Sequence, residues 1–195
     1  MTALLSMAAF ALACSISPGP VNVVALSSGA QHGLAASLRH VTGATVGFTV
    51  LLLLIGLGLQ ALLAHFPNLI EIVKWAGVVF LFYMASRLAV DNGQLGADTP
   101  ARGPSFAHGA AMQWLNPKAW LASLAGMGAY AANGDGRLVW QFAALYFVIC
   151  YVSIASWAYA GTFLRKYLRD AKRVRLFNRA MAMLLAASAL YLLVE

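Results

Sequence analysis

The sequence predicts an all-α integral membrane protein whose six transmembrane helices form two inverted repeats of three helices. Hydrophobic residues make up 62% of the 195 residues and charged residues only 10%, whereas soluble domains carry about 25% charged residues. The apolar residues gather in six runs, each close to the length of about 20 residues that crosses a bilayer. Two of these runs are interrupted by proline at corresponding positions. We therefore expect one transmembrane domain over residues 1–195.

The first three runs make up the first repeat, which we place at about residues 1–90. We expect the first span at residues 3–28, with a Pro-Gly-Pro interruption two-thirds of the way along it. The segment QHGLAASLRH, at 31–40, is expected to be a loop. The second span follows at residues 41–63, and the short turn AHFPN leads to the third span at 69–89.

The second repeat is expected at about residues 105–195, after a polar linker at 91–104 that Gly, Pro and Asp mark as a loop. Its first span, at 105–132, is interrupted by the sequence NPK. The tight loop NGDG leads to an uncharged span at 138–164, and a basic loop precedes the last span at 176–194. Because each half has three spans, the second half must be inverted in the membrane.

The distribution of positive charge predicts the orientation, because cytoplasmic loops of membrane proteins are rich in Lys and Arg. Seven of the 13 Lys and Arg residues lie between Arg165 and Arg179. If that loop is cytoplasmic, so are the loops after the first and third spans. Ten basic residues then face the cytoplasm, two face the other side and one lies inside a span. We therefore expect both termini outside the cytoplasm.

The first interruption is the sequence Ser17-Pro18-Gly19-Pro20, followed by Asn22. Proline removes a backbone hydrogen bond, and unsatisfied backbone is tolerated at membrane depth only where protein buries it or where it lines a wet cavity. The half-helix after the break has free N–H groups and the positive end of its dipole, which together bind anions. We expect these groups to bind a carboxylate and the freed carbonyls to bind an ammonium. The alternative is a plain proline kink that eases packing.

The second interruption, Asn116-Pro117-Lys118, lies 99 residues further on in the corresponding span. Paired interruptions of this kind point to a transporter binding site. Lys118 is the only charged residue deep within a span, where a lysine costs about 2.5–3.5 kcal/mol. We expect it to serve binding; the alternative is a lysine that extends to the membrane interface.

Other polar residues of the spans are candidates to line a cavity, although their spacing does not say which face inward. The four histidines have no metal-ligand spacing, so we expect neither a metal nor a cofactor. No Asp or Glu lies deep in a span. Glu71 lies near one end of the third span and His40 at the start of the second, which leaves no evident site for a coupling proton. The polar candidates are Ser15, Ser17, Thr42, Thr45, Gln113, Trp114, Ser153, Ser156, Trp157 and Tyr159.

These features resemble the LysE/RhtB family of amino-acid exporters over the whole chain. The resemblance rests on SPGPVNVVALSSGAQHG in the first span, NPKAW in the fourth, the six spans and the basic loop before the last. The ALSS…HG continuation is most similar to the branch that exports cysteine and O-acetylserine, and more loosely to the homoserine/threonine branch. The residues that match the family motifs are Pro18, Gly19, Pro20, Asn22, Asn116, Pro117 and Lys118, which with Ser17 form the expected substrate site.

The resemblance implies a secondary transporter that exports neutral or small polar amino acids across the bacterial inner membrane, driven by protons. The expected partners are the amino acid, the proton and the lipid bilayer, with a homodimer as an option and no nucleic acid. Some members carry aspartates within spans, and this sequence has none there, which puts an aspartate-based coupling scheme in doubt.

Two other functions compete with export. In a thiol–disulfide carrier, a cysteine accompanies the proline of each half; Cys14 precedes Pro18 by four residues, but Gln113 stands at the matching place before Pro117. An intramembrane enzyme or photoreceptor could instead use Lys118 as a Schiff base. No carboxylate of the spans is available as its counter-ion, so we expect no enzyme.

Overall fold

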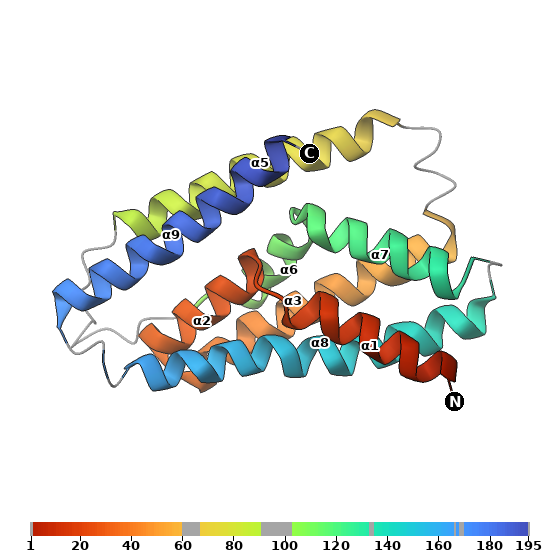
Figure 1. The fold of residues 1–195 in the computed structure, drawn as a ribbon, viewed down its shortest axis with the longest axis horizontal. Helices are drawn as coiled ribbons and strands as arrows, with labels where there is room; N and C mark the ends of the chain where they lie inside the picture. The colour runs from red at the N-terminus through yellow and green to blue at the C-terminus, as the bar shows by residue number, and fades with distance from the viewer. Residues whose placement is uncertain are drawn as a thin grey trace.

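Every regular element that the computed structural model describes is a helix (Figure 1). The described residues are 2–59, 67–90, 103–132, 135–165, 167 and 170–194. The first half of the chain contributes α1 (Thr2–Ile16), α2 (Pro20–His32), α3 (Leu34–Leu54), the π-helical turn η1 (Ile55–Leu59) and α5 (Pro67–Ala89). The second half contributes α6 (Phe106–Trp114), α7 (Pro117–Tyr130), α8 (Gly136–Arg165) and α9 (Ala171–Val194).

The predicted loop at 31–40 is wrong. Helix α2 ends at His32 and α3 begins at Leu34, so a single residue, Gly33, turns the chain between them. Gly33 has a φ of 81°, which a residue without a Cβ adopts at little cost. The residues that follow include good helix formers such as Leu and Ala, and they extend α3 through the segment expected to be a loop.

The last helix begins earlier than the sequence predicted, at Ala171 rather than 176. Asp170 explains the difference, because its Oδ1 accepts a hydrogen bond of 3.0 Å from the backbone N–H of Lys172 and so caps the helix. Asp135 does the same for α8, where its Oδ1 accepts from the N–H of Arg137 at 2.9 Å. Part of the basic segment is therefore helical. Most of the expected linker at 91–104 lies outside the described residues.

Helices α3 and α8 pack against each other. Helices α1 and α2 contact α8, and α6 contacts α3, while α5 and α9 lie side by side along one flank (Figure 1). The contact between α3 and α8 buries aromatic rings: Phe48 and Tyr146 have their ring centroids 4.5 Å apart. This arrangement surrounds both chain interruptions with helices.

Glycines allow two helix pairs to cross with their backbones nearly touching. On α3, a Cβ at Gly43 would lie 2.0 Å from the carbonyl oxygen of Phe106, so the missing side chain lets the backbones of α3 and α6 approach closely. Helices α2 and α8 cross in the same way, since a Cβ at Gly29 would lie 1.9 Å from the oxygen of Ala158 and a Cβ at Gly161 2.1 Å from that of Leu26.

Two of the described helices are long and apolar enough to cross a membrane, Leu34–Gly58 and Gly136–Leu164. The pair formed by α1 and α2, bent by 61°, meets the same test as one broken span. Trp75–Ala89 is apolar but shorter. These spans identify a helical membrane protein; the count of six spans and their inverted arrangement stay predictions.

Candidate functional site

The first chain interruption lies between α1 and α2. Helix α1 ends at Ile16, and Pro20 is the first residue of α2, where its missing N–H costs no hydrogen bond. Gly19 is fully extended, with φ −169° and ψ 174°. The chain therefore leaves one helix, is non-helical for three residues and enters a second helix that is bent by 61° from the first.

Side chains satisfy the carbonyl groups that the end of α1 leaves free. The amide nitrogen of Asn22 donates to the oxygens of Ser15 at 2.8 Å and Ser17 at 2.9 Å. The indole N–H of Trp157 on α8 donates to the oxygen of Ile16 at 3.0 Å, and the Ser17 hydroxyl donates to that of Cys14 at 3.2 Å. Asn22, in the first turn of α2, thus fixes the turn between the two half-helices by bonding back to the end of α1.

The second interruption lies between α6 and α7, at Leu115 and Asn116. The side-chain oxygen of Asn116 caps α7 by accepting from the backbone N–H of Lys118 at 3.2 Å. The indole of Trp120 donates to the oxygen of Trp114, the last residue of α6, at 2.8 Å. As in the first interruption, a proline opens the following helix.

Lys118 joins the two interruptions. Its Nζ donates to the hydroxyl of Ser17 at 2.7 Å and to the backbone oxygen of Ser17 at 3.2 Å, with a longer contact of 3.5 Å to the oxygen of Pro18. Helix α1 ends there, so the ammonium lies at the negative end of the helix dipole. Residues about 100 positions apart in the sequence therefore meet at one point.

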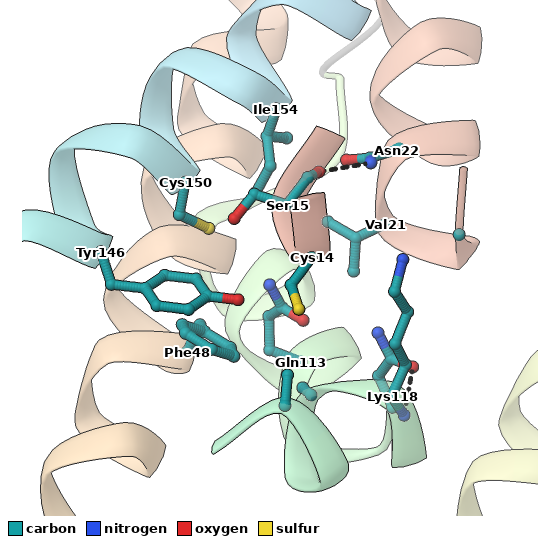
Figure 2. A pocket seen from close by; sticks show the side chains of 14 residues that line it. Cys14, Ser15, Val21, Asn22, Phe48, Gln113, Lys118, Tyr146, Cys150 and Ile154 are labelled. Carbon is teal, nitrogen blue, oxygen red and sulfur yellow. Dashed lines mark hydrogen bonds between the residues drawn. The ribbon is translucent and has the colours of Figure 1, made fainter. Parts of the chain in front are cut away.

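A small pocket lies beside this junction (Figure 2). Its cavity volume of ≈ 40 Å³ has room for about three water molecules, since one needs roughly 10–15 Å³ by this measure. Residues of both interruptions line it together with one face of α8 and single residues of other helices. They are Cys14, Ser15, Gly19, Val21, Asn22, Phe48, Gln113, Asn116, Lys118, Ala119, Ala122, Tyr146, Cys150 and Ile154.

Four of the residues expected to bind substrate line the pocket: Gly19, Asn22, Asn116 and Lys118. Ser17 touches it only through its bond to Lys118. The three prolines open or flank the half-helices and do not line the pocket: Pro18, Pro20 and Pro117. Of the additional polar candidates, Ser15 and Gln113 line it, whereas Thr42, Thr45, Trp114, Ser153, Ser156, Trp157 and Tyr159 do not.

Sequence reasoning missed Cys14, Tyr146 and Cys150 as pocket residues. Tyr146, Cys150 and Ile154 are spaced by four and therefore share one face of α8, which Figure 2 shows turned toward the pocket. Cys14 lies in the last turn of α1, and both cysteines carry free thiols. The spacing of four on α8 was the available signal, but it stands in a helix that is apolar on every side.

The pocket offers positive charge and hydrogen-bond donors without a carboxylate among its lining residues. Lys118 supplies the charge, and no side chain caps the first N–H groups of α2, which point along the positive end of its dipole. The hydroxyl oxygen of Ser15, a residue only 8% exposed, has no hydrogen-bond partner in the described structure. This arrangement suits a small ligand that carries a carboxylate.

Comparison with known proteins identifies the family of the chain. The family model described as "LysE type translocator" matches residues 12–195. The chain is 27% identical, over 92% of both chains, to the cysteine/O-acetylserine efflux protein of Escherichia coli (strain K12). It is 28% identical, over the same share of both chains, to the protein of that name from Shigella flexneri. No solved structure matches the chain.

Proposed function

We propose that this chain, which belongs to the family of LysE type translocators, exports small amino acids and binds them in the pocket between its two interruptions. The observation that carries the proposal is the position of Lys118. Its ammonium lies at the junction of both interruptions, lines the pocket and has no carboxylate of the described residues as a partner. A charge of this kind is costly to bury and is kept where it serves binding or transport.

The binding mode follows from the groups around the pocket. The carboxylate of the substrate lies at the first N–H groups of α2 and near Lys118, as anions do at helix N-termini. The substrate's ammonium takes over the oxygens of Ser17 that Lys118 occupies in this structure. The substrate ammonium thus replaces that of Lys118. When no substrate is bound, Lys118 keeps the Ser17 oxygens hydrogen-bonded while the empty transporter reorients toward the cytoplasm.

The small pocket favours a short amino acid over a long or aromatic one. The relatives at 27% and 28% identity are named for efflux of cysteine and O-acetylserine, so we propose these as the first substrates to test and homoserine or threonine as the next. The apolar wall of Phe48, Ile154 and Ala122 suits a side chain of this size better than a charged one.

The proposed architecture is one transmembrane domain with six spans in two inverted halves, in which α1–α2 and α6–α7 are the broken spans. The support is that both breaks open a helix with proline and meet through Lys118. We place the protein in the bacterial inner membrane with both termini in the periplasm, on the distribution of Lys and Arg. Proton coupling and a homodimer remain parts of the proposal that the family resemblance implies.

The test is counterflow in proteoliposomes. Purified protein is reconstituted with unlabelled amino acid inside, and the entry of a labelled amino acid from outside is followed for a panel that includes cysteine, O-acetylserine, homoserine, threonine, lysine and phenylalanine. We expect transient accumulation of the small neutral amino acids only. Counterflow of no amino acid would overturn the export function, and counterflow of lysine alone would overturn the proposed substrate class.

The thiol–disulfide carrier is the second candidate, because the structure brings both free cysteines to one pocket although they lie far apart in the sequence. The double substitution Cys14→Ser, Cys150→Ser separates the two functions. An amino-acid exporter should keep counterflow within about threefold of the wild-type rate, since serine replaces a thiol by a hydroxyl of similar size. A thiol carrier would lose all activity.

A further inference from the structure

Two histidines form a buried pair that the proposed binding site does not use. His40 of α3 is 0% exposed, and His108 of α6 is half-buried. Their ring centroids lie 5.6 Å apart, at an interplanar angle of 40°. The Nδ1 of His108 has no hydrogen-bond partner in the described structure, and the ring nitrogens of His40 have none apart from a contact with the backbone of Val21 that falls outside hydrogen-bond geometry. Orphaned polar atoms are rare in protein interiors and call for a reason.

The close crossing of α3 and α6 holds the pair in place. A Cβ at Gly109, next to His108, would lie 2.3 Å from the backbone oxygen of His40. The Nε2 of His108 lies 3.3 Å from the sulfur of Met84 on α5, and the ring also lies against Phe80. The positions of both imidazole rings therefore depend on how tightly α3, α5 and α6 pack together.

His40 lies next to the first turn of α2, which follows the first interruption. The backbone of Val21 is beside the His40 ring, and the side chain of Val21 lines the pocket. Val21 belongs to the first turn of α2, the turn whose N–H groups would receive the carboxylate. A movement of this turn would therefore change both the shape of the pocket and the surroundings of His40.

No counter-charge accompanies the pair. His108 is the titratable group that faces His40, and no carboxylate of the described residues pairs with either ring. The titratable groups on the neighbouring helices lie elsewhere: Arg39 and Arg87 are exposed, His32 lies in the last turn of α2, Lys118 bonds to Ser17, and Tyr146 and Cys150 line the pocket. An imidazolium at His40 would lie in the packed interior without a counter-charge, which is costly.

We propose that His40 and His108 together bind the single proton that alternates with the exported amino acid; this rests on the proposed export function. The packed arrangement holds the pair neutral. A proton on either ring favours another arrangement, in which the crossing of α3 and α6 loosens and the ring nitrogens gain water or backbone partners. Two positive rings at this distance would repel each other, so the pair takes up at most one proton beyond those of its two neutral rings.

Exchange follows from the opposed preferences of proton and substrate. The amino acid favours the arrangement in which the pocket is assembled, and the proton favours the one in which the pair is hydrated. A ligand that favours one state lowers the affinity for a ligand that favours the other. The proton taken up from water on one side is released to water on the other, and the amino acid moves in the opposite direction.

The experiment compares two modes of transport in the same proteoliposomes for the wild type, His40→Gln and His108→Gln. Counterflow needs no net proton movement, whereas accumulation driven by a pH gradient does. A gradient of one pH unit coupled to one proton supports about a tenfold accumulation. We expect this ratio in the wild type and a ratio of about one in both variants, with counterflow within about threefold of the wild type. His32→Gln is the matched control and should keep the tenfold ratio.

Binding gives a second measurement. Affinity for the transported amino acid, measured in detergent, should weaken by up to about tenfold per pH unit on acidification of the wild type, the limit for one competing proton, and should not change with pH in His40→Gln. Gradient-driven accumulation by His40→Gln or His108→Gln at the wild-type ratio would overturn the pair as the proton site. If the wild-type protein shows counterflow but no gradient-driven accumulation, the histidine pair is not a coupling site, although the export function still holds. Absence of counterflow in the wild type would overturn export itself.

Discussion

Lys118 is the residue that joins the two chain interruptions, and its environment explains how a charge can be kept inside the bundle. Its ammonium donates to two oxygens of Ser17 and lies near a third, on Pro18. Charge-assisted hydrogen bonds are roughly twice as strong as neutral ones. The lysine therefore needs no carboxylate as long as the end of α1 faces it.

Substitution of Lys118 separates its charge from its bulk. Lys118→Met keeps most of the length and removes the charge, so it should weaken amino-acid binding by about tenfold to a hundredfold, since a hydrogen bond to a charged group is worth about 1.5–3 kcal/mol. Lys118→Arg keeps the charge in a different geometry and should keep part of the activity. Equilibrium binding to purified, monodisperse protein measures both. Wild-type affinity in Lys118→Met would show that the lysine serves only the structure.

The sequence predicted the residue types of the site better than their contacts. It indicated Asn22 as a polar group for the substrate, but the amide nitrogen donates to the carbonyl of Ser15 in α1 and to that of Ser17 just after α1. Such contacts depend on the 61° bend, which no local pattern specifies. Cys14 and Cys150 were not expected in the pocket, because helices that are apolar on every side carry no signal of which face points inward.

At the level of the helices, close crossings at glycine hold the half-helix α2 against α8. The oxygen of Ala158 leaves no space for a Cβ at Gly29, and the oxygen of Leu26 leaves none at Gly161. These contacts are between backbones, which cannot rotate away as side chains do. The position of the N-terminal end of α2, where we propose that the carboxylate binds, thus depends on Gly29 of the same helix and on Gly161 of α8.

Gly29→Ala should destabilise the protein by about 1–3 kcal/mol, the usual cost of adding a methyl group to a packed interior. Gly128→Ala is the matched control, because a Cβ at Gly128 meets nothing within 4 Å. Thermal unfolding in detergent, followed by the loss of the monodisperse peak in size-exclusion chromatography, measures the difference. Equal midpoints for the two variants would contradict the account of the α2–α8 crossing.

Helices were predicted well where hydrophobic runs were long, and their ends less well. The spans at 41–63 and 138–164 correspond to the α3–η1 segment and to α8. The ends differ where a single residue acts: Gly33 replaces a loop of ten residues with a one-residue turn, and Asp170 starts α9 inside the basic segment. These are capping and backbone effects, which hydropathy does not register.

For the whole molecule, the open prediction is its orientation in the membrane. In a background of Cys14→Ser and Cys150→Ser, we expect Arg173→Cys, at the start of α9, to react only with a reagent that reaches the cytoplasm. Ala132→Cys, after α7, should react with one confined to the periplasm. Both positions are exposed in the structure. The opposite labelling pattern would reverse the orientation that the Lys and Arg distribution predicts.

The central claim is that the exported amino acid occupies the pocket between the two interruptions, and protection of Cys14 from alkylation tests it most directly. Cys14 lines the pocket and is half-buried. In Cys150→Ser protein that retains counterflow, a saturating transported amino acid should slow alkylation of Cys14 by about tenfold or more, because a bound ligand buries most of the surface of such a site. Arg173→Cys, in the Cys14→Ser, Cys150→Ser background and far from the pocket in the sequence, should react at the same rate with and without the amino acid. An unchanged rate at Cys14, in protein that still transports, would contradict the account.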